Sequence, residues 1–291
     1  MAASQHDKAT YLDGTLIQGV CVLLMTGCSF LVSTAVRPDP ETGERFNHPL
    51  LIAWLCTTSF IFYLPAHFIQ QARRRSKRTG EEEALLPPPA QSTLESTTPL
   101  TELGVVDTWK LAAPFAVLWY TTNACIDAAL VLTTVSSLTL CFSSAGLWTL
   151  LLGAAFGIER LTKLKLAASF ATILGVGLVC KGDAAASDFQ QERILGNVLA
   201  ITAAFGYAAF LIYYRKRLEG RPVSLTLFFG LVGATSLVVF TPLLVIFNFE
   251  GGVPIPTSRT ITLCLLGDVL FSFTAGNFQI LLCLPEMKLT A

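Results

Sequence analysis

Eight long apolar stretches dominate this sequence and restrict it to one class of fold. Each is close to the roughly 20 helical residues that a hydrocarbon core about 30 Å thick requires. Lys and Arg lie outside these stretches or at their first two positions. No segment alternates apolar and polar residues over about ten positions, as the strands of a membrane barrel do. The sequence therefore predicts an all-α polytopic membrane protein with about eight transmembrane helices, at residues 14–36, 50–70, 109–132, 135–157, 164–180, 195–214, 223–247 and 261–283.

The composition argues against several other classes of function. Charged residues make up 14% of the chain, whereas a soluble domain has about 25%. The net charge of zero argues against a nucleic-acid partner, which needs a basic surface. The eight cysteines form no CxxC or Cys/His cluster, so we expect no metal site and no cofactor. Because HExxH, GxSxG and Walker motifs are absent, we expect no enzyme.

The distribution of Lys and Arg predicts the orientation of the chain in the membrane. When alternate connections are taken together, 15 of the 20 cations fall on the side of both termini. Cytosolic loops carry the excess of these residues. We therefore expect both terminal tails, residues 1–13 and 284–291, to be cytosolic.

The longest segment without an apolar stretch is 72–107. Its Pro-, Ser- and Thr-rich sequence cannot bury enough apolar surface to fold, so it predicts a disordered cytosolic loop. Within it, Glu81, Leu85 and Leu86 fit the acidic dileucine pattern that clathrin adaptors bind. A chance match is the alternative, since few positions of the pattern are fixed. As a sorting motif, it favours endolysosomal or vacuolar membranes.

Two acidic residues, Asp127 and Asp268, lie well inside the apolar stretches. A carboxylate at the bilayer centre costs at least about 2.5–3.5 kcal/mol, so each must be protonated, solvated or close to an interface. Asn123 lies one turn before Asp127 on the same helix face, and Ser and Thr are dense between residues 136 and 149. These groups predict a shared polar cavity. The alternative is that each hydroxyl bonds a carbonyl of its own helix.

Small residues at four-residue spacing predict where helices pack, because small side chains let backbones approach closely in a membrane. These residues are Gly153/Gly157, Ala167/Ala171/Gly175 and Ala200/Ala204/Ala208. The third and fourth apolar stretches are separated by Thr133 and Thr134 alone, so we expect them to form an antiparallel hairpin.

Several motifs follow one another in an informative order over about residues 10–265. They are FNHP at 46–49, WYTTN at 119–123, SSAGLWTL at 143–150, a Tyr-to-basic run at 207–217 and FFGLVG at 228–233. Together they resemble the drug/metabolite transporter superfamily and, within it, solute carrier family 35, subfamily F. The resemblance implies a ten-helix carrier of two inverted five-helix repeats that works by alternating access around a central cavity.

Carried onto this chain, the resemblance implies a first repeat over residues 14–180 and an incomplete second repeat over 195–283. The run expected after about Gly267 is absent, which predicts a chain that stops two helices short. Asp268 falls in this departing part and receives little functional weight. Together with the polar face of the third stretch, the resemblance gives the expected substrate-binding residues as Asn123, Asp127, Ser143, Ser144, Gly146, Thr149 and Tyr207.

The sequence thus predicts a secondary transporter of a small metabolite in a vacuolar, endolysosomal or Golgi membrane. Its partners would be a small-molecule substrate, the lipid bilayer and, through the dileucine pattern, a clathrin adaptor, with a homodimer as an assembly to test. The apolar stretches hold no Lys or Arg at depth, which weakens a nucleotide-sugar substrate, whose diphosphate needs a cation. The alternative function is a transport-inactive membrane protein with a partner-binding or regulatory role.

Overall fold

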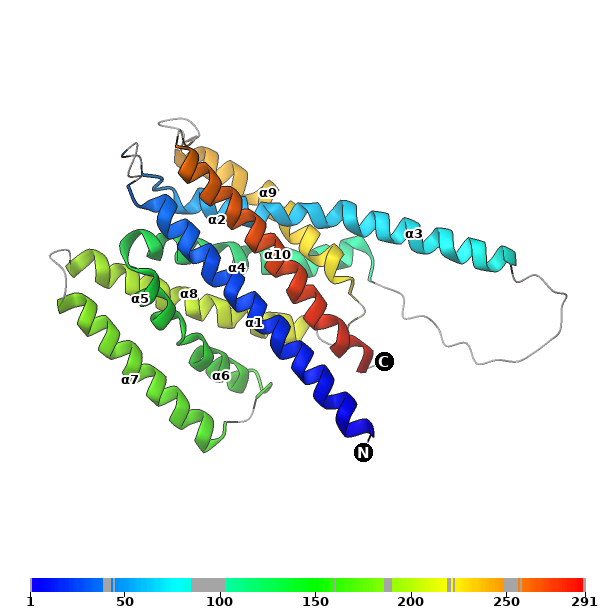
Figure 1. Ribbon diagram of the computed structural model, residues 1–291, viewed down its shortest axis with the longest axis horizontal. Helices are drawn as coiled ribbons and strands as arrows, with labels where there is room; N and C mark the ends of the chain where they lie inside the picture. Colours follow the sequence, from blue (N-terminus) through cyan, green and yellow to red (C-terminus); the bar gives the residue numbers. More distant parts are fainter. Residues whose placement is uncertain are drawn as a thin grey trace.

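The computed structural model describes residues 2–38, 43, 45–84, 103–159, 161–185, 190–218, 221, 223–248, 256 and 258–289. Over these residues the chain is helical, with short connections between the helices (Figure 1). The elements are α1 (Ala2–Val36), α2 (Pro49–Thr58), η1 (Ser59–Phe62), α3 (Tyr63–Ala84), α4 (Val105–Leu132), α5 (Val135–Phe142), α6 (Ala145–Ala155), α7 (Lys163–Ala185), α8 (Gln190–Arg217), α9 (Leu225–Asn248) and α10 (Arg259–Leu289).

Seven helical segments among the described residues are long and apolar enough to cross a membrane. They are Gly19–Val36, Pro49–Arg73, Val105–Leu132, Val135–Ala155, Arg193–Arg217, Leu225–Ile246 and Arg259–Asn277. At most half of each segment is buried inside the molecule, so many apolar side chains face outward, as they do in a bilayer. The all-α polytopic membrane class is thereby confirmed. The stretch expected at 164–180 is helical as well, within α7, but its described part is not among these seven.

Two helices extend further than the sequence predicted. α1 begins at Ala2 instead of residue 14, and α3 continues to Ala84, so residues 72–84 of the expected disordered loop are helical. The α3 extension, residues 72–84, is rich in Arg and Glu, which have a high intrinsic helix propensity. Glu81 lies in this last part of α3, whereas Leu85 and Leu86 lie outside the described residues.

Two of the spans are broken within the membrane. The second changes to 3₁₀ geometry at η1, just before Pro65, which then occupies the first turn of α3, where a missing N–H is tolerated. The fourth, expected to be one helix, is divided into α5 and α6 by a turn at Ser143 and Ser144. α6 ends at Ala155, and Gly157, two residues later, has a φ of 72° that suits glycine. Gly157 therefore belongs to the helix terminus and does not serve as the expected packing residue.

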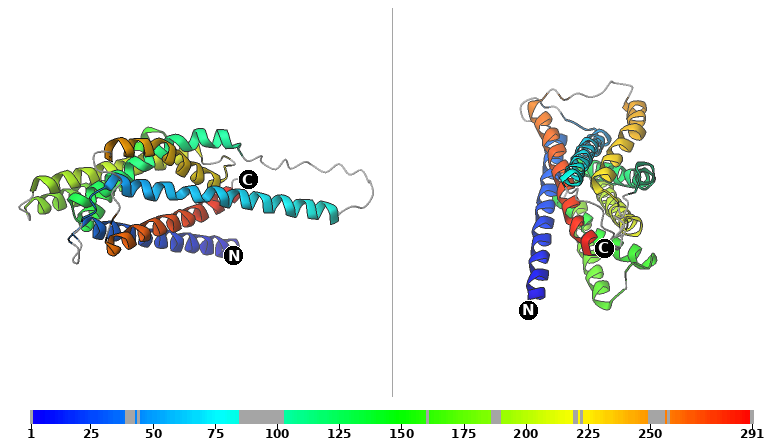
Figure 2. Two further views of the ribbon diagram at one scale, coloured as in Figure 1. Left: turned by 90° about the horizontal axis from the view of Figure 1, so that it is seen from above. Right: turned by 90° about the vertical axis from the view of Figure 1, so that its right-hand side faces the viewer.

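The bundle is organised by two long interhelical interfaces. α1 packs along α10, and the two run in opposite directions, which brings the chain termini to the same end of the molecule (Figures 1 and 2). α4 packs along α8, where the expected face of Ala200, Ala204 and Ala208 is fully buried. The hairpin prediction is wrong in its packing, because α5 and α6 lie mainly against α8 and not along α4. The small residues of α7, residues 167, 171 and 175, are exposed instead of packed.

α9 meets the broken second span through glycine. A Cβ at Gly233 would collide with the backbone of Ile61 and lie 2.7 Å from the carbonyl carbon of Phe60. A Cβ at Gly230 would lie 2.9 Å from the backbone nitrogen of Leu64. The FFGLVG motif therefore provides the close backbone approach that holds α9 against η1 and the start of α3.

Candidate functional site

Three of the expected substrate-binding residues bond to their own helix. The Asn123 amide donates to the carbonyl oxygen of Trp119 at 2.8 Å, and Thr149 Oγ1 donates to that of Ala145 at 2.8 Å. Ser143 is exposed and its Oγ donates to the carbonyl oxygen of Leu140 at 2.6 Å. Local bonding, the alternative to a shared cavity, thus accounts for these three groups in the observed conformation.

The other expected substrate-binding residues on the fourth span and on α8 differ in how deeply they are buried. Ser144 is buried and its Oγ has no hydrogen-bond partner among the described atoms; the same holds for Trp148 Nε1 one turn later. Gly146 is exposed, with open space where a Cβ would lie. Tyr207 of α8 is half-buried, and its ring packs edge-on against Phe142 and Phe210. Ser144 and Tyr207 therefore lie toward the interior of the bundle, whereas Ser143 and Gly146 lie on its outer surface.

The Trp of the WYTTN motif is a core residue. Trp119 stacks on Phe115 with a ring-centroid distance of 5.6 Å and contacts Phe210 at 4.9 Å and Phe60 at 5.9 Å. Its neighbours come from α4, α8 and η1, so the ring ties together three spans. Dense aromatic packing of this kind stabilises the bundle beside Asn123.

Asp127 is buried on α4, with 8% of its surface exposed, and makes no hydrogen bond within the described part of the chain. Asp268 of α10 lies on the same side of the bundle interior, because Ile126 and Leu130, next to Asp127 along α4, pack in one apolar cluster with Leu265, three residues before Asp268. The thiols of Cys28 and Cys56, from α1 and α2, hydrogen-bond to Asp268, and Tyr120 lies two turns before Asp127 on α4, where its hydroxyl donates to the carbonyl oxygen of Leu50. Four helices therefore meet around the two acids.

Asp268 is held in this cluster by sulfur donors. Its Oδ2 accepts a hydrogen bond from Cys56 Sγ at 2.7 Å, and its backbone oxygen accepts one from Cys28 Sγ at 3.7 Å. Cys28 Sγ also lies 3.5 Å from Ser272 Oγ. We call Asp127, Asp268, Cys28, Cys56 and Ser272 the carboxyl cluster. The sequence around Asp268 departs from the family motif and so gives this residue little weight, although an acid at membrane depth is itself a functional signal.

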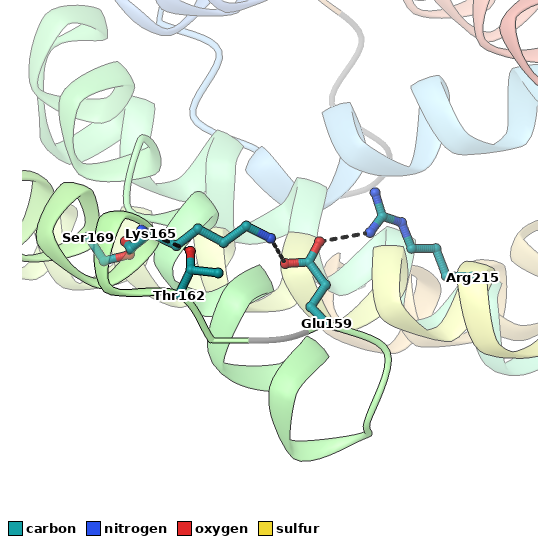
Figure 3. Close-up of polar contacts among 5 residues, drawn as sticks. All are labelled: Glu159, Thr162, Lys165, Ser169 and Arg215. Atoms are coloured by element: carbon teal, nitrogen blue, oxygen red, sulfur yellow. Dashed lines mark hydrogen bonds and ion pairs between the residues drawn. The ribbon is translucent and has the colours of Figure 1, made fainter.

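A polar contact at the other end of the bundle joins elements far apart in the sequence. Glu159, between α6 and α7, accepts hydrogen bonds from Lys165 Nζ at 3.1 Å and from the Arg215 guanidinium of α8 at 3.3 Å (Figure 3). The hydrogen bond from Lys165 and the positive charges of Lys165 and Arg215 lower the pKa of Glu159. Lys216 lies 4.5 Å from the ring centroid of Phe156 at the end of α6.

These features define a polytopic helical membrane protein with acids buried among its spans. No family model matches the chain. It is 30% identical to an uncharacterized transporter of Schizosaccharomyces pombe, over 87% of this chain and 77% of the relative. It is 28% identical to a thiamine-repressible mitochondrial transport protein of Saccharomyces cerevisiae, over 82% of this chain and 68% of the relative. An uncharacterized vacuolar membrane protein of Saccharomyces cerevisiae is 26% identical, over 90% of this chain and 75% of the relative.

The chain belongs to the same family of membrane transporters as the S. pombe protein. More distantly, 58% of it is 25% identical to solute carrier family 35 member F5 of Mus musculus, of which 33% is covered. This match supports the predicted relation to solute carrier family 35.

Proposed function

We propose that the protein is a secondary transporter that moves a small polar metabolite by alternating access between two inverted repeats. The observation that carries the proposal is the reciprocal packing of the bundle. In the proposed first repeat, α1 is the first span and α4 the third; in the second repeat, α8 is the first span and α10 the third. The first span of each repeat therefore packs along the third span of the other repeat, as α1 with α10 and α8 with α4. A two-fold relation between repeats requires these two interfaces to occur together, and they are the two longest in the bundle.

The polar groups at these interfaces suit a small substrate. Asn123 and Asp127 lie on α4, and Tyr207 lies on α8, which packs against it. Together with Ser144, whose buried hydroxyl is unpaired among the described atoms, they are the residues we propose to contact the substrate. The described spans carry no Lys or Arg at depth, so a diphosphate group would lack a cation, and we propose a substrate other than a nucleotide sugar.

For the compartment, we propose an endomembrane. A relative that is named a vacuolar membrane protein supports this proposal, whereas another relative is named a mitochondrial transport protein. Fluorescent tagging of the full chain, with organelle markers, distinguishes the two. Mitochondrial labelling would contradict the proposal.

Solute flux through the purified chain tests the proposed function. Proteoliposomes are preloaded with a metabolite extract, and mass spectrometry identifies the solutes that exchange. We expect at least one small polar solute to cross, and Asn123→Ala to reduce its flux. Thr202→Ala is the matched control, because Thr202 is exposed on α8 and bonds its own helix. Absence of flux from a folded, monodisperse chain would contradict transport and favour the partner-binding or regulatory alternative.

A further inference from the structure

The carboxyl cluster combines two acids with surroundings that cannot neutralise them. Asp127 and Asp268 are both more than nine-tenths buried, and the polar groups in the cluster beside them are the thiols of Cys28 and Cys56 and the hydroxyl of Ser272. The Tyr120 hydroxyl, two turns before Asp127, donates to the carbonyl oxygen of Leu50. None of these carries a positive charge, and no Lys, Arg or His lies within two helical turns of Cys28, Cys56, Asp127 or Asp268 along their own helices. Two negative charges in such a place repel each other and lack the solvation that water would give them.

We propose that Asp127 and Asp268 form one proton-binding site, and that its proton is the ion coupled to solute movement; the second part rests on the proposed transport function. The two acids are not equivalent. Asp268 already receives a hydrogen bond from Cys56, whereas the Asp127 carboxylate has no partner among the described residues. A carboxylate oxygen of Asp127 therefore takes up the incoming proton, and Asp268 supplies the negative charge that the proton offsets.

The donor set favours a proton over a metal ion. A hard cation such as Mg²⁺ or Ca²⁺ takes about six or more oxygen ligands, and a soft metal would take several thiolates or imidazoles. The cluster offers two carboxyls and two thiols that act as hydrogen-bond donors, and no three His, Cys, Asp or Glu side chains are placed to hold a metal ion where the chain is described. A proton needs only one acceptor oxygen.

The position of the site links the proton to the conformation of the bundle. α1, α2 and α4 supply Cys28, Cys56 and Asp127, whereas α10 supplies Asp268 and Ser272, so the cluster lies where the two proposed repeats meet. Proton uptake from water on one side forms an O–H bond on Asp127 and reduces the charge of the pair from −2 to −1. Release on the other side breaks the same bond. The repulsion between α4 and α10 thus changes with protonation, which biases the equilibrium between arrangements of the repeats.

Infrared difference spectroscopy of the purified full chain in lipid tests the site without a known substrate. We expect one protonated-carboxyl band that titrates with pH, that is lost in Asp127→Asn, and whose midpoint shifts by about one pH unit or more in Asp268→Asn. Asp107→Asn is the matched control, since this exposed acid pairs with Lys110 at the start of α4, and the band should not change. If D127N does not fold, Asp127→Glu keeps the acid and must move the band, whereas Asp107→Glu must not.

Three results would overturn the proton site: a band unaffected by D127N, a band altered equally by D107N, or a signal that follows Na⁺ at constant pH. Solute flux distinguishes this inference from the proposed function. If the band titrates as expected but no solute moves in proteoliposomes, the site stands and transport fails. If a solute moves at a rate independent of pH and of Asp127, transport stands and the proton site fails.

Discussion

At the scale of single residues, Glu159 connects the end of the fourth span to α8. Its carboxylate accepts hydrogen bonds from Lys165 and Arg215, which are exposed to solvent by 48% and 40% of their side chains. Exposed ion pairs contribute about 0.2–1 kcal/mol each, because water screens them and holding long side chains costs entropy. The contact thus adds little to the total stability. Its main effect is to hold the α6–α7 connection beside α8.

We expect Glu159→Gln to lower the free energy of unfolding by less than about 1 kcal/mol at neutral pH. The pKa of Glu159 is lowered from its ordinary value of 4.5, so its stabilisation is present above pH 4.5 and is lost as the pH falls through the lowered value. Thermal unfolding in detergent should therefore show E159Q converging with the wild-type protein in acid. A double-mutant cycle with Arg215→Gln isolates the pair, and an E159Q difference that persists below this pH would contradict the argument.

At the scale of helices, the breaks in the second and fourth spans decide how the bundle packs. η1 presents its backbone to α9, and this contact is possible because Gly233 has no side chain. The atoms that a Cβ would meet are backbone atoms, which cannot move aside as a flexible side chain would. The small residue is therefore required by the geometry of the contact, independently of the apolar character of the two spans.

We expect Gly233→Ala to destabilise the protein by about 1–3 kcal/mol, because the added methyl group forces α9 away from η1. Gly175→Ala in α7 is the matched control, since a Cβ there meets nothing within 4 Å, and its effect should be neutral or slightly favourable. The melting temperature and the monodisperse yield of the two variants in detergent test the contact. Equal melting temperatures and yields of G233A and G175A would contradict the predicted clash, because α9 would then move away from η1 without loss of stability.

The sequence could predict the spans but not their internal breaks. Length and apolarity alone place helices at 105–132 or 225–248 to within a few residues, because the bilayer imposes the same requirement on every span. The turn at Ser143–Ser144 and the 3₁₀ segment η1 depend on contacts with α8 and α9, which are distant in the sequence. The sequence likewise could not predict that Asp268 lies in the same cluster as Asp127, since this requires α10 to pack beside α1 and α2.

At the scale of the whole molecule, the arrangement of the helices and the distribution of charge favour the same topology. The antiparallel packing of α1 and α10 brings the N- and C-termini to one end of the bundle (Figure 1). The alternate connections along the sequence that share a side with both termini carry 15 of the 20 Lys and Arg residues. Glu159, Lys165 and Arg215 meet although they come from two such connections, which joins two of the basic segments in space. We therefore propose that the basic end of the bundle faces the cytosol.

Glycosylation mapping tests this orientation with a matched pair of insertions. The natural sequence has no Asn-x-Ser/Thr acceptor, so any glycan must come from an added site. We expect a flexible extension carrying one acceptor to be glycosylated when it is inserted at Gly43, in the connection between α1 and α2. The same extension inserted at Gln91, between α3 and α4, should remain unmodified, because that connection lies on the side of the basic residues. A glycosidase-sensitive mass shift for the Gln91 insertion, and none for the Gly43 insertion, would reverse the orientation and place both termini in the lumen.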